Sequence, residues 1–136
     1  MDRIKPLLFL ANIYKFKIIK DKNHIEYVVF ENSNLCSIDG TTDKTQFEAV
    51  ENHIHLLDKI RKKEYFALFP IAQELAKSLL SCLKEAFPDK HFCVYATLTL
   101  KDSFIIRFHQ KWPHEEPYYD LNNIDESKEK IFFFEN

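Results

Sequence analysis

Glycine is almost absent from this chain of 136 residues, which contains only Gly40, where an average composition would give roughly nine or ten. A Gly-rich dinucleotide loop needs two or three glycines, and a P-loop or the nucleophile elbow of the hydrolase fold needs two. These three classes of site are therefore excluded, and no other catalytic signature replaces them. The pair Asp39 and Gly40 indicates a turn, at which we expect a positive φ for the glycine.

Cysteine is also scarce, and long apolar runs are missing. Cys36, Cys82 and Cys93 are odd in number and widely spaced, which fits neither a disulfide framework nor a zinc pattern. Reduced thiols are typical of the cytoplasm. The apolar run that starts at Leu7 is too short for a signal peptide, and no uncharged stretch approaches the roughly 18 residues that cross a bilayer. We therefore expect a cytoplasmic protein without a membrane partner.

Neither sign of charge is in large excess. The chain has 19 Lys and Arg against 21 Asp and Glu, a net charge of −2, whereas nucleic-acid-binding domains are strongly basic. A nucleic acid partner is therefore not expected. Hydrophobic residues make up 46% and aromatic residues 15%, so the chain can bury a substantial core. The length and the lack of repeats or linkers predict a single domain over residues 1–136.

The first elements are predicted to be a hairpin and a helix. Residues 12–31 contain two β-forming runs around a polar turn, which is typical of a β-hairpin. Apolar residues at helical spacing then predict a helix from about 43 to 60. Two overlapping capping boxes open it, Asp43-x-x-Gln46 and Thr45-x-x-Glu48. His53 and His55 would then point to different sides of this helix and could not share a ligand.

The second helix has the clearest periodicity in the chain. Over residues 68–86, apolar side chains recur every three or four positions. Pro70 fits the first turn, where its missing N–H would have no partner, and Pro88 marks the end of the helix.

Two strands follow, residues 92–100 and 103–111, with apolar side chains at their even positions. A two-residue turn would place Arg107 opposite Ala96, whereas a three-residue loop pairs Ala96 with Ile106. Because a one-residue slip moves every side chain to the other face, we favour the three-residue loop. The opposite face is then half-polar, and we expect it to be exposed to solvent. It carries Cys93, Tyr95, Thr97, Thr99, Ile105, Arg107, His109 and Lys111.

The end of the chain is predicted to be a long loop and a last strand. Residues 112–130 have little periodicity, and the apolar run after them predicts the strand (Ile131, Phe132, Phe133 and Phe134). The order is β-β-α-α-β-β with this further strand, which indicates an α+β fold. We expect an antiparallel sheet of two hairpins with two helices packed on one face.

Residues 107–120 are the densest stretch of functional side chains. Trp, Tyr and Arg dominate binding hot spots. We therefore predict a partner-binding surface made of Trp112, His114, Glu115, Glu116, Tyr118, Tyr119 and Asp120, supported by Arg107 and His109. The alternative is structural: Trp112 closes one end of the core and the acids lie in a solvated loop. The spacing of His and acids matches no zinc site that we recognise, so we expect neither a metal nor a cofactor.

Charge is distributed unevenly along the chain. Residues 112–130 carry six acids and two lysines, whereas residues 1–30 carry six Lys or Arg and three acids. Complementary charge speeds encounter and selects partners. An acidic, Tyr-bearing loop therefore indicates a basic protein partner.

Together these features favour a small bacterial protein of the immunity or inhibitor kind, which neutralises a cognate toxin by covering its active site. The bacterial source is inferred from the Lys-, Asn- and Phe-rich composition. The alternative is an enzyme, a metal-independent nuclease or a phosphate-substrate hydrolase, that uses His109 with Arg107 and Lys111, or Cys93 as nucleophile. The chain is expected to be a monomer, or a homodimer formed through the strand Ile131 to Phe134.

Overall fold

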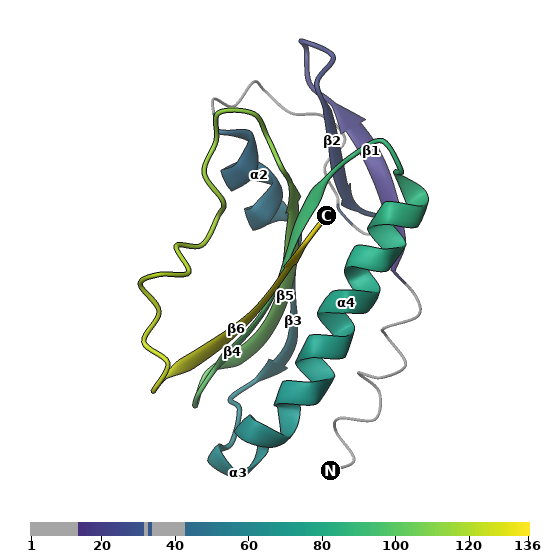
Figure 1. Ribbon diagram of the computed structural model, residues 1–136. Helices are drawn as coiled ribbons and strands as arrows, with labels where there is room; N and C mark the ends of the chain where they lie inside the picture. Colours follow the sequence, from purple (N-terminus) through teal and green to yellow (C-terminus); the bar gives the residue numbers. More distant parts are fainter. Residues whose placement is uncertain (1–13, 32, 34–42) are drawn as a thin grey trace.

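The computed structural model describes residues 14–31, 33 and 43–136. Cys36 and the turn predicted at Asp39 and Gly40 lie outside these residues. The described elements are, in order, β1 (Phe16–Lys20), β2 (Glu26–Phe30), α2 (Lys44–Glu51), β3 (His53–Asp58), α3 (Lys62–Tyr65), a 3-10 turn (Phe66–Leu68), α4 (Phe69–Ala86), β4 (Phe92–Thr99), β5 (Ser103–Gln110) and β6 (Glu129–Glu135). Within the described residues the strands form a two-stranded sheet, β1-β2, and a four-stranded antiparallel sheet in the order β3-β5-β4-β6 (Figure 1).

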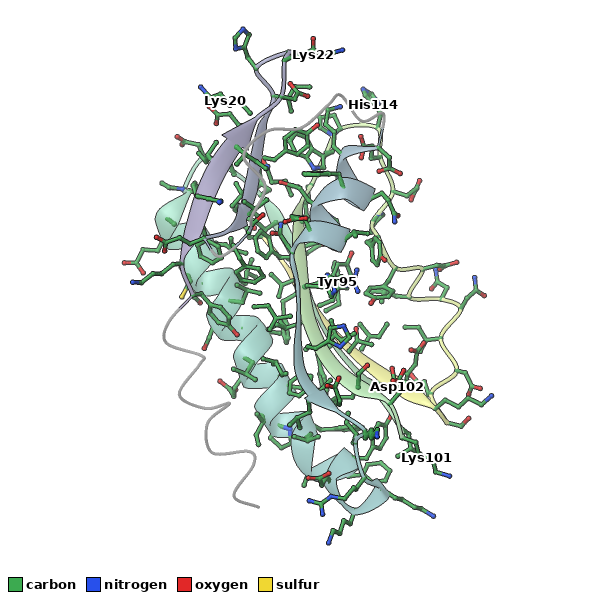
Figure 2. All side chains as sticks on the ribbon, turned by 180° about the vertical axis from the view of Figure 1, so that it is seen from behind. Lys20, Lys22, Tyr95, Lys101, Asp102 and His114 are labelled. Atoms are coloured by element: carbon green, nitrogen blue, oxygen red, sulfur yellow. The ribbon has the colours of Figure 1, made fainter. Side chains whose placement is uncertain are left out.

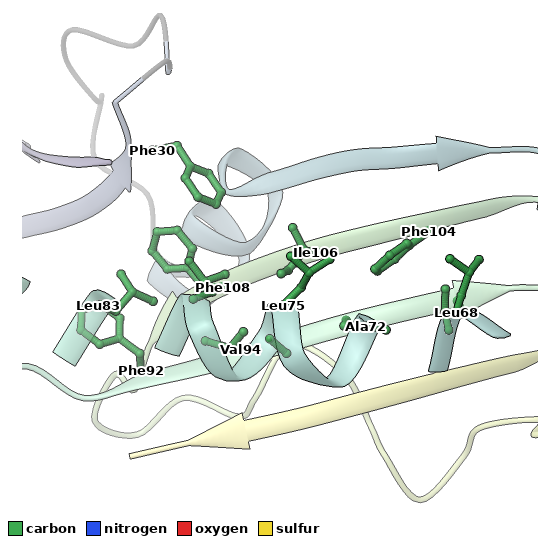
Figure 3. Packing of buried hydrophobic residues seen from close by; sticks show 14 of the residues in the cluster. Phe30, Leu68, Ala72, Leu75, Leu83, Phe92, Val94, Phe104, Ile106 and Phe108 are labelled. Carbon is green, nitrogen blue, oxygen red and sulfur yellow. The ribbon is translucent and has the colours of Figure 1, made fainter. Parts of the chain in front are cut away.

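The predicted α+β class is confirmed, and so are the first hairpin, the long helix and the last strand. α4 packs against β4 and β6, and its apolar side chains meet those at the even positions of the sheet (Figure 3). Burying a Leu or Phe side chain contributes about 1.5–3 kcal/mol. The buried cluster includes Leu75, Leu79, Val94, Ile106 and Phe108.

The predicted register between β4 and β5 is also confirmed. Ala96 lies opposite Ile106, and three residues, 100–102, join the strands. Lys101 in this loop has φ 66°, the left-handed region that such loops require at one position.

The predicted helix over residues 43–60 is wrong in its second half. α2 ends at Glu51, and residues 53–58 form β3, which pairs with the edge of β5. The buried Asn52 separates the two elements, and its side chain bonds the backbone of Val28 and Phe30 in β2. The open hydrogen-bonding edge of β5 and this contact outweigh the local helical spacing, because tertiary pairing routinely overrides propensity.

The helices do not share one face of the four-stranded sheet. α4 covers the face formed by the even positions, whereas α2 lies on the opposite face (Figure 1). The polar side chains of β5 account for this position: the Arg107 guanidinium, through Nη1, donates to the Ala49 carbonyl in α2 at 3.0 Å. Buried polar groups need such partners, and α2 supplies them.

α3, the 3-10 turn and α4 form one helical run, Lys62–Ala86, which by length and composition alone could cross a membrane. Its buried apolar side chains, among them Leu68, Leu75 and Leu79, belong to the core, and α4 packs on β4 and β6. The core helix of a water-soluble fold has the same composition.

Candidate binding surface

The surface is built on a buried carboxylate, Glu48 of α2. One oxygen, Oε1, accepts from Gln110 N and from Trp112 Nε1, both at 2.7 Å, and the other, Oε2, accepts from Val28 N at 2.9 Å and Gln110 Nε2 at 2.8 Å. Burial raises the pKa of Glu48 to about 7, although the four donors act in the opposite direction. Glu48 thus ties the hairpin, β5 and the start of the loop to one helix.

Glu48 was not among the predicted site residues. Its position in Thr45-x-x-Glu48 indicated a capping box, but the N-cap of α2 is Asp43, whose side chain accepts from Gln46 N at 2.9 Å. Nothing in the local pattern distinguishes a capping glutamate from a buried one. Only the donors brought by β2 and β5 identify its role.

The loop between β5 and β6, residues 111–128, is fixed at its start by Trp112. The indole ring packs beside Tyr27 at 5.5 Å and belongs to a second small core with Ile19 and Val29. The structural alternative for this residue is therefore correct: Trp112 closes one end of the core.

Glu115 anchors the next turn of the loop at the N-terminus of α2. Its carboxylate accepts from Thr45 N at 2.7 Å and from Lys44 N at 3.3 Å, and Lys44 Nζ lies 3.8 Å away. These backbone donors hold the pKa of Glu115 below its usual value, although its partial burial acts in the opposite direction. The favourable interaction with the helix dipole adds to this contact.

Tyr118 and Tyr119 form the third anchor of the loop. The Arg107 guanidinium lies 4.5 Å from the centre of the Tyr118 ring, and Tyr119 meets Tyr95 edge to face at 5.0 Å. Tyr118 N also donates to His109 Nε2 at 3.3 Å. Arg107 and His109, which were predicted to support a partner-binding surface, lie beneath the loop and are buried.

The face that was predicted to be exposed is buried instead. Cys93, Tyr95, Thr97, Arg107 and His109 are all buried, because α2 and the two tyrosines of the loop pack over them. The sequence could not reveal this cover, since a half-polar face is typical of solvent exposure unless another element supplies partners.

His109 is held neutral in this interior. Its Nδ1 lies 2.7 Å from the Gln110 carbonyl, so Nδ1 carries the proton, and Nε2 accepts from the Tyr95 hydroxyl at 3.0 Å. Burial lowers the pKa of His109. It also raises the pKa of the Cys93 thiol to about 11, and Glu135 acts in the same direction. The two residues are cross-strand neighbours, but both are buried, so solvent contacts neither the imidazole nor the thiol.

His53 and His55 lie on the same side of β3, not on different sides of a helix, with ring centres 5.3 Å apart. The prediction that they point apart is wrong because a strand repeats every two residues. Among the described residues, no three His, Cys, Asp or Glu side chains meet in an arrangement that could hold a metal ion.

His114, Glu116 and Asp120 remain exposed on the outer side of the loop. Figure 2 places His114 at the end of the loop next to α2, with Tyr95 beneath the loop. A shallow hollow of about 390 Å³ lies beside them, with three carboxylate side chains on its rim. Its lining is Asp43, Thr45, Gln46, His114, Glu115, Glu116, Pro117 and Tyr118. The exposed part of the predicted site is therefore acidic.

A family model described as "Uncharacterized protein PM0498 family" matches residues 9–136. No curated protein and no solved structure matches the chain.

Proposed function

We propose that this chain, which belongs to the uncharacterized PM0498 family, is a protein-binding domain of the immunity or inhibitor kind. In this proposal it acts in the bacterial cytoplasm and neutralises a basic toxin by covering the toxin's active site. The outer side of residues 111–128 forms the contact surface.

The observation that carries the proposal is a preformed acidic loop. Trp112, Glu115 and the two tyrosines fix the loop at three places. Its exposed charged side chains are four carboxylates, against two lysines (Glu116, Asp120, Asp125 and Glu126; Lys111 and Lys128). A loop that is already ordered loses less conformational entropy on binding. Its charge favours encounter with a basic surface.

The predicted site residues divide into two groups in this proposal. His114, Glu116 and Asp120 are exposed and contact the partner. The others hold the loop in place, and the half-buried tyrosines also present ring edges beside the contact. These positioning residues are Trp112, Glu115, Tyr118, Tyr119, Arg107 and His109.

The experiment is co-expression with the product of the adjacent gene, followed by calorimetric titration of the purified pair. The double variant Glu116→Lys/Asp120→Lys should bind at least tenfold more weakly than the wild type, because both changes reverse exposed charges in the contact. Glu74→Lys on the exposed side of α4 is the matched control, with a side chain that is 70% exposed. Equal affinity of the double variant and the control would refute the proposed surface, and failure of the adjacent product to bind at all would refute the proposed function.

A further inference from the structure

Phe66, in the turn between α3 and α4, is the most exposed large apolar side chain in the described part of the chain. It is 73% exposed, whereas Val50, the next, is 46% exposed. Its ring lies 5.2 Å from Tyr65 and 5.4 Å from Phe69, and Phe69 in turn meets Phe132 of β6. A row of aromatic rings thus leads from the surface into the core.

These rings form one wall of an apolar hollow of about 370 Å³. The other walls come from the turn after β4 and from the segment that leads into β6, so three separate parts of the chain meet here. The lining residues are Lys62, Tyr65, Phe66, Phe69, Leu100, Glu126, Ser127 and Lys130. Figure 2 shows this end of the molecule at Lys101 and Asp102, far from the hairpin tip marked by Lys20 and Lys22.

Two features of the hollow lack a partner within the described residues. The Tyr65 hydroxyl is buried and has no hydrogen bond, although buried hydroxyl groups are normally satisfied. Neither Lys62 nor Lys130 forms an ion pair, and the Lys130 ammonium lies over the Phe132 ring at 5.4 Å. The lining therefore combines aromatic rings with two lysines that form no ion pair with a described residue and one carboxylate, Glu126, and this apolar, net positive lining complements a ligand with an apolar body and a carboxylate.

We infer that this hollow binds a segment of a partner protein in which a large apolar side chain stands next to an Asp or Glu. The apolar side chain fills the hollow against Phe66 and Phe69, and the carboxylate lies between Lys62 and Lys130. Glu126 on the rim favours a discrete peptide over an anionic bilayer, because a bilayer would bring negative charge to the whole rim. The hollow includes Glu126 and Ser127 from the end of the loop 111–128, but none of the three residues proposed above as partner contacts, His114, Glu116 and Asp120, lines it.

The test uses a displayed library of random heptapeptides, selected on the full chain and counter-selected on Phe66→Ser. We expect enriched peptides to carry an aromatic or large aliphatic residue within two positions of an acid. A labelled enriched peptide should bind Phe66→Ser and Lys62→Glu/Lys130→Glu at least tenfold more weakly than the wild type in fluorescence anisotropy. Binding should also weaken with added salt, since exposed charges are screened. Val50→Ser, which removes an exposed apolar side chain from α2, is the matched control and should bind normally.

Several results would overturn the inference. One is the enrichment of basic or wholly apolar peptides, and another is the absence of any peptide enriched on the wild type relative to Phe66→Ser. A third is binding of the labelled peptide to Lys62→Glu/Lys130→Glu with the same affinity as to the wild type. Binding to phosphatidylserine vesicles that disappears in Phe66→Ser would assign the hollow to a membrane. Self-association in sedimentation that disappears in the same variant would assign it to a second copy of the chain.

Discussion

At the scale of single residues, the shortage of glycine has a structural cost. Within the described residues, four residues other than glycine have positive φ: His24, Lys59, Lys101 and His114. The left-handed conformation costs an L-residue roughly 1–2 kcal/mol, because Cβ approaches the following carbonyl oxygen. Turns that other proteins build with glycine are built here with His and Lys.

Lys101→Gly should therefore stabilise the protein by about 0.5–1 kcal/mol, the relief of this strain less the extra freedom of glycine in the unfolded chain. Asp102→Gly, at the next position of the same loop, is the control and should destabilise, because Asp102 is not among the described residues with positive φ. Urea unfolding of the three proteins measures the difference. A loss of stability in Lys101→Gly would show that the left-handed conformation carries no strain here.

Glu48→Gln tests the buried carboxylate. The two oxygens of Glu48 accept four hydrogen bonds. With a pKa of about 7 the group is largely protonated at pH 5, but each oxygen of the acid still accepts, whereas the amide NH₂ of Gln would face two donors and accept from neither. Unsatisfied buried groups cost about 1–3 kcal/mol each. We expect the free energy of unfolding at pH 5 to fall by about 2 kcal/mol or more. Glu51→Gln, at the partly exposed end of α2, is the control and should have a much smaller effect.

At the scale of elements, α2 depends on the loop that crosses its N-terminus. A helix of eight residues is too short to be stable by itself. Its first N–H groups are satisfied by Asp43 from its own sequence and by Glu115 from a segment about 70 residues away. Helix and loop therefore stabilise each other, and this mutual support keeps the acidic surface in place.

Glu115→Ala should lower the free energy of unfolding by about 1 kcal/mol, the usual effect of losing a helix cap. Glu116→Ala removes the neighbouring, exposed carboxylate and should change it by less than about 0.5 kcal/mol. Chemical denaturation measures both, and hydrogen exchange of the Thr45 amide should accelerate only in Glu115→Ala. Equal effects of the two substitutions would mean that Glu115 does not cap the helix.

At the scale of the whole molecule, two buried groups give stability opposite dependences on pH. The pKa of Glu48 is raised in the folded state, so its contribution is greatest below pH 4.5 and is lost as pH rises towards 7. The pKa of His109 is lowered, so its contribution is present above pH 6.5 and is lost as pH falls. Between about pH 4.5 and pH 7 the stability of the protein therefore depends on the contributions of both Glu48 and His109.

The variant Glu48→Gln separates the contribution of Glu48 to the pH dependence of stability from that of His109. Because this variant cannot ionise at position 48, the difference in unfolding free energy between it and the wild type should narrow between pH 5 and pH 8. The pKa of Glu48 is about 7 in the folded protein against the ordinary value of 4.5. This shift corresponds to a decrease of up to about 3 kcal/mol in the stability difference between the two proteins. Urea unfolding across this range measures it, and a constant difference would show that Glu48 has an ordinary pKa.

Local patterns determined a large part of this protein. The helical spacing of apolar residues predicted α4. The alternation of apolar and polar side chains along β4 and β5 predicted the pairing of Ala96 with Ile106, because a slip of one residue would move every side chain to the other face. Residue type alone also placed Trp112, Tyr118 and Tyr119 in a predicted partner-binding surface, and Glu116 and Asp120 in an acidic loop; the structure shows that the first three anchor this loop. These features are readable because each depends on residues close together in the chain.

Only the tertiary structure decided which surfaces stay open to solvent. Residues 53–58 became a strand because β5 offered an unpaired edge, and α2 took the face opposite α4 because Arg107 and Gln110 needed partners there. The same contacts buried Glu48, which the local pattern indicated as a capping residue, and His109, which was predicted to lie on a solvent-exposed face. Whether a polar side chain is buried depends on donors and acceptors distant in sequence, and no local pattern contains that information.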